Sequence, residues 1–180
     1  PPAAPPSSAR TARGEPESAE GPVERLARRN EVTESSSPPD PELYSLYECL
    51  KDEMRRRDID LPIMAPAYVH GVWTDTDLME SMMLAPEVAH RHFELATARA
   101  LQMVDGYASA GADQIGVGGD FSGTRPLISP ESYSEFIVPQ VRTLSRAVHQ
   151  AGLKAVNASD GDLWPVIDDF LFGCEVDAYM

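Results

Sequence analysis

The stretch that decides the fold is VDGYASAGADQIGVGGD, residues 104–120. Its first part ends a predicted helix that starts near Pro86 and has an apolar stripe at helical spacing: Phe93, Ala96, Ala100, Val104 and Tyr107. Gly111 suits the left-handed residue that closes such a helix. Residues 113–119 then predict a buried strand, and Asp120 follows it directly.

The same order of helix, glycine and strand occurs twice more. Ser129, Pro130 and Glu131 predict a helix start, and Gly152 ends that helix before the strand of residues 153–158. Residues 162–172 predict a further helix closed by Gly173, with a strand over 176–180. Pro139 should kink the second helix near Glu135, because proline lacks the N–H and crowds the preceding turn.

Three elements are predicted before these repeats. Residues 41–57 predict a helix with a stripe made of Leu43, Leu46, Leu50 and Met54. Residues 61–69 predict a strand, and residues 74–84 a short helix. Strands that alternate with helices indicate an α/β protein with a parallel sheet. About four strands are recognisable, roughly half of an eight-stranded barrel, and we expect the chain to be truncated after residue 180.

Residues 1–40 differ from the rest in composition. They are rich in Pro, Ser and Glu and contain no aromatic residue, so we expect a disordered tail before a folded part over residues 41–180. The tail lacks the apolar core of a secretory signal and is too acidic for a transit peptide.

Charge and cysteine content exclude several classes of protein. The net charge is -14, and residues 61–180 have 6 Lys and Arg against 16 Asp and Glu, which argues against nucleic-acid or membrane-surface partners. No apolar run is long enough to cross a bilayer. Cys49 and Cys174 match no metal-binding or disulfide spacing. We therefore expect a cytoplasmic protein with a small-molecule substrate, and a homodimer as an open alternative.

Several motifs together resemble the uroporphyrinogen decarboxylase superfamily. They are AGADQIGVGGD at 110–120, LISPESYSEFIVPQ at 127–140 and HQAGLKAVNASDGDLWPVIDDFLFGCEVDA at 149–178. The resemblance implies a (β/α)8 TIM barrel with catalytic groups at the carboxyl ends of its strands. About half of this barrel is present here. The resemblance also implies chemistry on tetrapyrroles or on corrinoid methyl groups.

The sequence departs from the motifs of both reaction types. Corrinoid-linked methyltransferases of the superfamily use a zinc-binding His-x-Cys, and Ala158 and Asp160 stand at those positions. Because alanine has no donor atom and aspartate is a poor partner for zinc-bound thiol chemistry, we expect no metal and no cofactor. The Arg-rich amino-terminal motif of the decarboxylase has no clear match, and its active-site tyrosine corresponds to Leu78.

The candidate site residues follow predicted strands. Asp120 and His70 are the predicted catalytic residues, a carboxylate for ring N–H groups or proton transfer and a titratable imidazole. Arg125, Ser159 and Asp160 are predicted to bind substrate, with Arg125 as the partner of a substrate carboxylate. Each residue also has a structural alternative, such as a cap for Asp160 or an ion pair for Arg125.

The sequence therefore favours a cofactor-free lyase that decarboxylates a tetrapyrrole. A corrinoid-dependent methyltransferase or demethylase with a diverged metal site, and a catalytically silent barrel, are the alternatives. We further expect the chain alone to associate through unpaired strand edges, because four strands cannot close a barrel.

Overall fold

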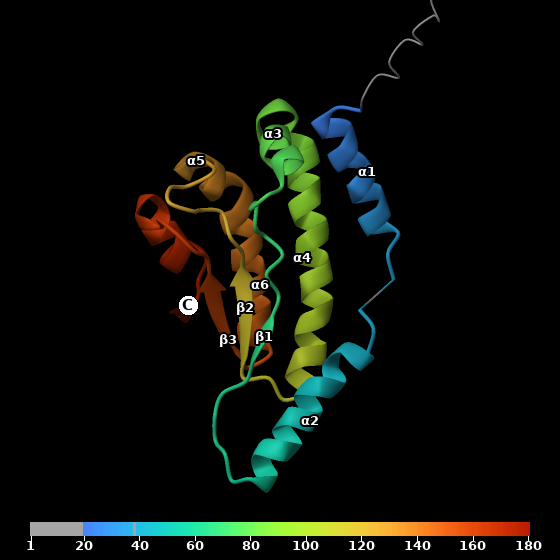
Figure 1. The fold of residues 1–180 in the computed structure, drawn as a ribbon, viewed down its shortest axis with the longest axis vertical. Helices are drawn as coiled ribbons and strands as arrows, with labels where there is room; N and C mark the ends of the chain where they lie inside the picture. Colours follow the sequence, from blue (N-terminus) through green and yellow to red (C-terminus); the bar gives the residue numbers. More distant parts are fainter. Residues whose placement is uncertain (1–19, 38) are drawn as a thin grey trace, which may run out of the picture.

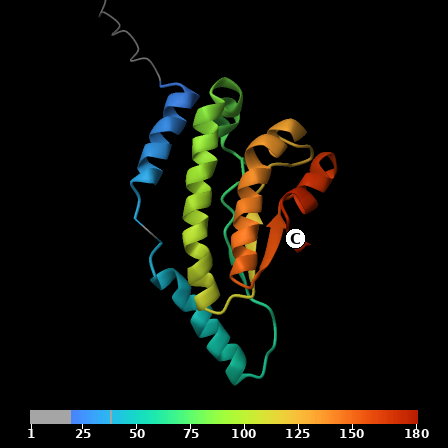
Figure 2. The same cartoon turned by 180° about the vertical axis from the view of Figure 1, so that it is seen from behind.

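The computed structural model of the protein describes residues 20–37 and 39–180 (Figure 1). Its centre is one parallel sheet whose strands are neighbours in chain order: β1 (Met64–Pro66), β2 (Gln114–Gly118), β3 (Lys154–Ala158) and β4 (Ala178–Tyr179). The long helices α4 (Pro86–Ser109) and α6 (Val138–Gln150) cover one face of the sheet (Figure 2). Parallel strands joined by helical crossovers form part of a (β/α)₈ barrel, so the predicted α/β fold is confirmed.

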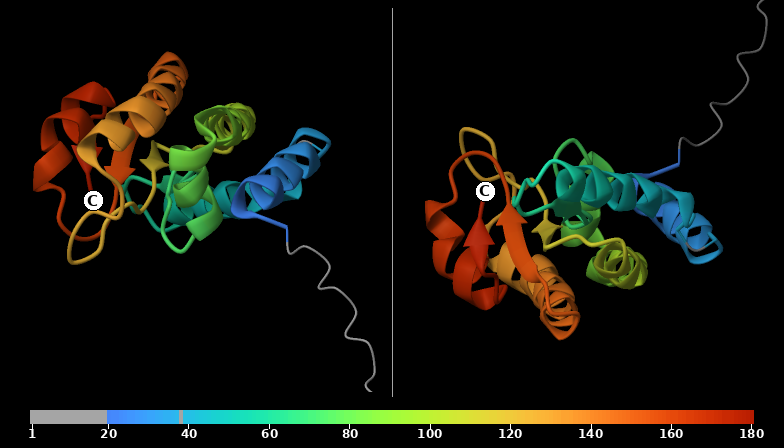
Figure 3. Two further views of the ribbon diagram at one scale, coloured as in Figure 1. Left: turned by 90° about the horizontal axis from the view of Figure 1, so that it is seen from above. Right: turned by 90° about the horizontal axis from the view of Figure 1, so that it is seen from below.

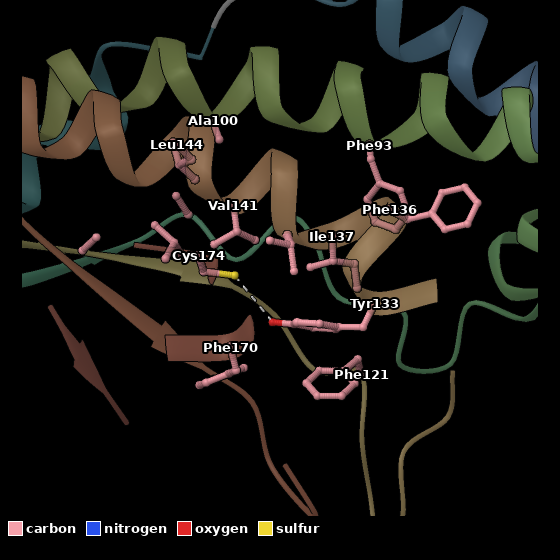
Figure 4. Close-up of a cluster of buried hydrophobic side chains, with 14 of the residues drawn as sticks. Phe93, Ala100, Phe121, Tyr133, Phe136, Ile137, Val141, Leu144, Phe170 and Cys174 are labelled. Carbon is pink, nitrogen blue, oxygen red and sulfur yellow. Dashed lines mark hydrogen bonds between the residues drawn. The ribbon is translucent and has the colours of Figure 1, made fainter. Parts of the chain in front are cut away.

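The core lies between this sheet face and the two helices. Ile115 and Val117 of β2 point into it and are fully buried. Figure 4 shows a cluster of buried core side chains, in which the ring centroids of Tyr133 and Phe121 lie 4.4 Å apart, with the rings tilted by 43°. The Tyr133 hydroxyl lies 3.8 Å from the Cys174 sulfur, and burial raises the pKa of this thiol to about 12. Cys174 is therefore an unreactive core residue.

The helix ends lie close to where the glycine and proline signals predict them. Gly111 and Gly152 both have positive φ, at 88° and 79°, in the turns that follow α4 and α6.

The helix that starts at Pro130 does not run straight to Gln150. It has a short first turn, α5 (Pro130–Ser132), and then the π-helix η1 (Tyr133–Ile137), which ends two residues before Pro139. The missing N–H of proline accounts for this interruption.

Three predicted elements are shorter or of another type. The strand predicted over residues 61–69 forms only as β1, because Pro62 and Pro66 cannot donate to a sheet ladder. The helix α3 (Thr76–Leu84) starts two residues late, with Asp75 as its cap. The helix predicted over 162–172 is instead the 3₁₀ turn η2 (Trp164–Val166) and the π-helix η3 (Asp169–Gly173). Gly173 does not close it with positive φ; Glu175, with φ 53°, takes that conformation.

The prediction of disorder is wrong for residues 22–34, which form the helix α1 (Pro22–Glu34). Leu26 is fully buried, and Arg25 and Arg29 pair with Asp77 and Asp75 of the α3 region. Both end-on views in Figure 3 place α1 on the outer side of α4, away from the sheet. Contacts with residues some fifty positions later stabilise this helix, and the local composition does not reveal them. Residues 1–19 lie outside the described part of the chain.

The helix α2 (Glu42–Arg56) is present as predicted, but its leucine stripe does not face the core. Leu43, Leu46 and Leu50 are exposed, whereas Tyr44 and Tyr47 pack edge-on against Tyr107 of α4. The tyrosines, not the leucines, therefore attach α2 to the rest of the molecule.

Two carboxylates stabilise the amino-terminal ends of the strands through hydrogen bonds and ion pairs. Asp113 accepts hydrogen bonds from the Ile63 N–H and from Lys51. Asp177 accepts from the Ala155 N–H and pairs with Lys154 and His149. Burial raises the pKa of Asp177, but these three donors outweigh it and lower that pKa to about 2.

Within the described residues, no helix is both long and apolar enough to cross a bilayer.

Candidate functional site

The carboxyl ends of β2 and β3 bring three of the predicted site residues together. Asp120 follows β2, and Ser159 and Asp160 follow β3. The Asp160 N–H donates to Asp120 Oδ1 at 3.0 Å, and the Phe121 N–H donates to Ser159 Oγ at 3.3 Å. These bonds join the two strand ends into one rim, where barrel enzymes place their chemistry.

A pocket of about 310 Å³ opens at this rim. It is lined by Tyr68, Gly119, Asp120, Ala158, Ser159, Asp160 and Met180. The lining contains two carboxylates and two hydroxyls, those of Ser159 and Tyr68, but no Lys, Arg or His. Such a pocket favours a ligand that offers N–H or O–H donors, and Tyr68 and Met180 provide apolar surface beside them.

A glycine turn brings Asp120 to the pocket. Gly119 has a φ of 144°, and a methyl group on it would lie 2.5 Å from the backbone nitrogen of Gly71. Only glycine allows the segment of residues 70–73 to approach this closely. The Val72 and Trp73 N–H groups then both donate to the Asp120 carbonyl, at 2.8 and 3.0 Å. The backbone of Asp120 is therefore fixed from the direction of β1.

The structure places His70 away from the pocket, although it follows the first strand as predicted. Its ring is fully buried on the helix side of the sheet, where Nε2 bonds Thr97 Oγ1 of α4 at 2.9 Å. Burial, together with the nearby His92, lowers the pKa of His70 to about 4. The expectation of a titrating catalytic imidazole at the rim is therefore corrected. His70 instead attaches the segment of residues 70–73 to α4.

The reason for this placement is a local break in the strand pattern. β1 ends at Pro66, and the Val69 N–H donates to the Ala67 carbonyl at 3.0 Å in a tight turn. Alternation of side chains between the two faces holds only within a strand. Tyr68 therefore reaches the pocket while His70 turns toward the helices.

Arg125 is not among the residues that line the pocket. It is exposed in the loop after β2, where its carbonyl accepts from the Gly123 N–H at 3.0 Å. Within the described residues it makes no ion pair, and neither Asp120 nor Asp160 is its partner. Its predicted role with a substrate carboxylate stays a prediction.

Sequence reasoning missed Tyr68 and Met180. Tyr68 lies over Gly116 of β2, where a larger residue would collide with its ring, and burial raises the pKa of its hydroxyl. The glycine in the middle of a buried strand was the available signal, since it often marks a close approach. Met180 lies directly after β4 (Ala178–Tyr179); the strand predicted over residues 176–180 included it, so it was not recognised as a residue at a strand end.

The other histidines have partners of their own. His90 lies 3.3 Å from Glu135, His92 Nδ1 bonds Asn30, and His149 pairs with Asp177.

The side chains at the rim do not fit a thiophilic zinc site. Ala158 has no donor atom, and Asp160 supplies only a carboxylate. Across residues 20–37 and 39–180, no three His, Cys, Asp or Glu side chains are grouped so that they could hold a metal ion. Cys174 is buried in the core, and Cys49 is on the surface of α2.

Comparisons with known proteins agree with this architecture. The family model of uroporphyrinogen decarboxylase (URO-D) matches residues 59–169. A methyltransferase from Methanosarcina mazei superposes with a TM-score of 0.64 over 81% of this chain, at 17% sequence identity. This chain spans 45% of the length of that methyltransferase. No curated protein matches the sequence.

Proposed function

The chain belongs to the uroporphyrinogen decarboxylase family, and from this premise we propose that it acts in the decarboxylation of a tetrapyrrole, with Asp120 as the group that binds the ring. The supporting observation is the chemistry of the rim pocket. Its polar groups are the carboxylates of Asp120 and Asp160 and the hydroxyls of Ser159 and Tyr68, which can accept the N–H groups of pyrrole rings. Tyr68 and Met180 offer apolar contact to the faces of such rings.

The reaction needs no cofactor, because the substrate supplies its own electron sink. When a pyrrole ring is protonated on carbon, it can accept the electron pair of the bond between a side-chain methylene and its carboxylate. Carbon dioxide leaves, a proton adds to the methylene carbon, and the ring loses its extra proton. Asp120 stabilises the cationic ring by accepting its N–H groups and by its negative charge. Arg125 would hold another carboxylate of the substrate, from outside the present pocket.

Asp120 is prepared for this role by its surroundings. Its Oδ1 is occupied by the Asp160 N–H, and no described residue hydrogen-bonds its Oδ2. The backbone bonds from Val72 and Trp73 fix the position of the residue. Binding therefore does not require the carboxylate to be ordered first.

The first experiment measures binding and turnover separately. A titration with an octacarboxylic porphyrin reports affinity, and chromatography of a porphyrinogen incubated with the protein reports loss of carboxyl groups. Asp120→Asn removes the charge while keeping the shape, and we expect it to weaken binding by about tenfold or more, as for a hydrogen bond to a charged group. Asp105→Asn, an exposed acid on α4, is the matched control. Equal affinity of Asp120→Asn and the parent chain would refute the role of Asp120.

A methyltransferase is the second candidate, since the M. mazei structure with a similar fold has that name. This reaction would need an activated acceptor other than a zinc-bound thiolate, because Ala158 replaces the histidine of that site. Incubation with methylcobalamin and a thiol, followed by the change in corrinoid absorption, distinguishes the two. Corrinoid demethylation without loss of porphyrinogen carboxyl groups would favour this candidate. Absence of both reactions would favour a catalytically silent barrel.

A further inference from the structure

Helix α2 has two apolar faces, and among residues 20–37 and 39–180 only one of them has a partner. Tyr44 and Tyr47 contact Tyr107 of α4, and Lys51 pairs with Asp113. The second face consists of Leu43, Leu46 and Leu50, which lie at helical spacing and are 45%, 70% and 43% exposed. None of the fifteen residues of α2 is buried.

This helix also lies at the edge of the protein. Figures 1 and 2 both show that it crosses the base of α4 and that its second half projects beyond the sheet. A helix of this length is only marginally stable without the burial of an apolar face. The leucine face is the apolar surface of α2 that no described residue covers.

We propose that the leucine face of α2 is an interface with a second copy of this chain, in which the two α2 helices pair antiparallel. This proposal is independent of the proposed function, because α2 contributes no residue to the rim pocket. Two features of α2 favour a second copy as the partner: the distribution of its charges and the spacing of its apolar residues.

The charges of α2 are divided between its two ends. The first part has Glu42 and Glu48, with Asp40 just before the helix, and no basic residue. The second part ends in Arg55, Arg56 and Arg57, whose contacts are with Asp52 and Glu53 of the same helix. An antiparallel copy places the arginine end of each helix beside the acidic end of the other. A parallel copy would place three arginines beside three arginines.

The apolar residues interdigitate in the antiparallel arrangement. Full overlap of the 15 residues Glu42–Arg56 puts the middle residue, Cys49, at the twofold axis. At 1.5 Å of rise per residue, Leu46 then lies about 3 Å along the seam from Leu50 of the second copy. Leu43 lies next to Met54 of the second copy by the same measure. Leu43, Leu46, Leu50 and Met54 of the two copies, eight side chains in all, form one continuous apolar seam. This is expected of a twofold interface in which the same patch faces itself.

Cys49 provides a direct probe of this geometry. It is exposed on the flank of the leucine face, and Cys174 is buried, so a maleimide reagent reacts with Cys49 alone. Packed helix axes lie about 8–10 Å apart. A short bis-maleimide should therefore link Cys49 to Cys49 of the second copy. Sedimentation equilibrium of the unmodified chain measures the dimer constant.

The decisive variant is Leu46→Glu, with Leu84→Glu as the matched control. Leu84 ends α3 and is 68% exposed, close to the 70% of Leu46, but it lies far from α2 in the chain. Glutamate is a good helix former, so α2 should persist, which circular dichroism can check. Because the change enters both halves of the seam, we expect Leu46→Glu to weaken dimerisation by at least about a hundredfold. Leu84→Glu should leave it unchanged.

Charge reversal tests the antiparallel direction. Glu42→Arg alone should weaken the dimer, and Glu42→Arg combined with Arg56→Glu should restore it. A parallel pair would show no such rescue.

Three results would overturn the proposal. They are a monomer at the highest soluble concentration, association that Leu46→Glu and Leu84→Glu weaken equally, and a dimer that yields no Cys49 cross-link. Association through the open edges of β1 and β4 would give the second or the third of these results. Dimer loss specific to Leu46→Glu, together with the Cys49 cross-link, supports the proposal.

Discussion

The buried imidazole of His70 should make the stability of this protein depend on pH in a way that one substitution removes. The folded state holds the ring neutral, with its pKa lowered to about 4 by burial, whereas an unfolded histidine titrates near 6.5. Between these values the unfolded chain binds more protons than the folded one. The free energy of unfolding therefore falls as the pH decreases from about 6.5 to about 4.

The magnitude follows from the shift and from the surroundings of the ring. At pH 4 the linkage amounts to about 3 kcal/mol relative to pH 7, a large fraction of the stability of a small domain. The hydrogen-bonding pattern agrees with a neutral ring. Thr97 Oγ1 has one proton to give, to Phe93 O or to Gln140 Oε1, so His70 Nε2 is the donor to Thr97. His70 Nδ1 has no partner among the described residues, and a proton there would be a second buried donor without an acceptor.

Urea unfolding of the parent chain and of His70→Gln, at several pH values between 7 and 4, tests this expectation. Glutamine can still donate to Thr97 but does not titrate in this range, so its stability should fall about 3 kcal/mol less than that of the parent chain. His90→Gln, at a half-exposed position beside Glu135, is the control and should parallel the parent. Carboxylates with lowered pKa values contribute equally to all three curves. Parallel curves for the parent chain and His70→Gln would refute the burial of His70.

Three further predictions concern α1, the strand ends and the rim. Leu26→Ala should lower the free energy of unfolding by about 2–5 kcal/mol, whereas Val32→Ala, at 65% exposure on the same helix, should change it by less than about 0.5 kcal/mol in the same urea assay. Asp177→Asn should cost up to about 1 kcal/mol at neutral pH, since its pair is partly exposed, and should flatten the loss of stability that acid titration shows between pH 4 and 2. Metal analysis of the purified chain should find no stoichiometric zinc, because Ala158 and Asp160 cannot form a thiophilic site; one tightly bound zinc per chain would mean that other residues are the ligands.

Much of the fold could be predicted because its signals are local. The Pro86 and Pro130 helix starts, the Gly111 and Gly152 helix ends and the apolar run at 113–119 each depend on a few adjacent residues. Elements that depend on distant contacts could not be predicted in this way. The helix α1 forms through Leu26 and through ion pairs with residues about fifty positions away, and its local composition resembles that of a disordered segment.

The same distinction separates the site residues whose position was predicted correctly from those whose position was not. Asp120, Ser159 and Asp160 follow well-formed strands, and the parallel register of β2 and β3 brings them to one rim as predicted. His70 and Arg125 follow irregular segments, where strand alternation no longer determines direction, and neither lines the pocket. Position after a strand was therefore informative where the strand itself is well formed, as β2 and β3 are.

The two ends of the sheet use aspartate in opposite ways, and this contrast supports a function at the rim. At the amino-terminal ends, Asp113 and Asp177 each have a lysine partner and a backbone donor, so their charges stabilise the fold. At the carboxyl ends, Asp120 and Asp160 line one pocket and have no basic partner among the described residues. The negative charges of Asp120 and Asp160 are therefore not balanced by a Lys or Arg of the described fold. A bound ligand with N–H donors and a developing positive charge would balance them, so the rim of the folded chain should bind such a ligand more tightly than a neutral analogue of the same shape.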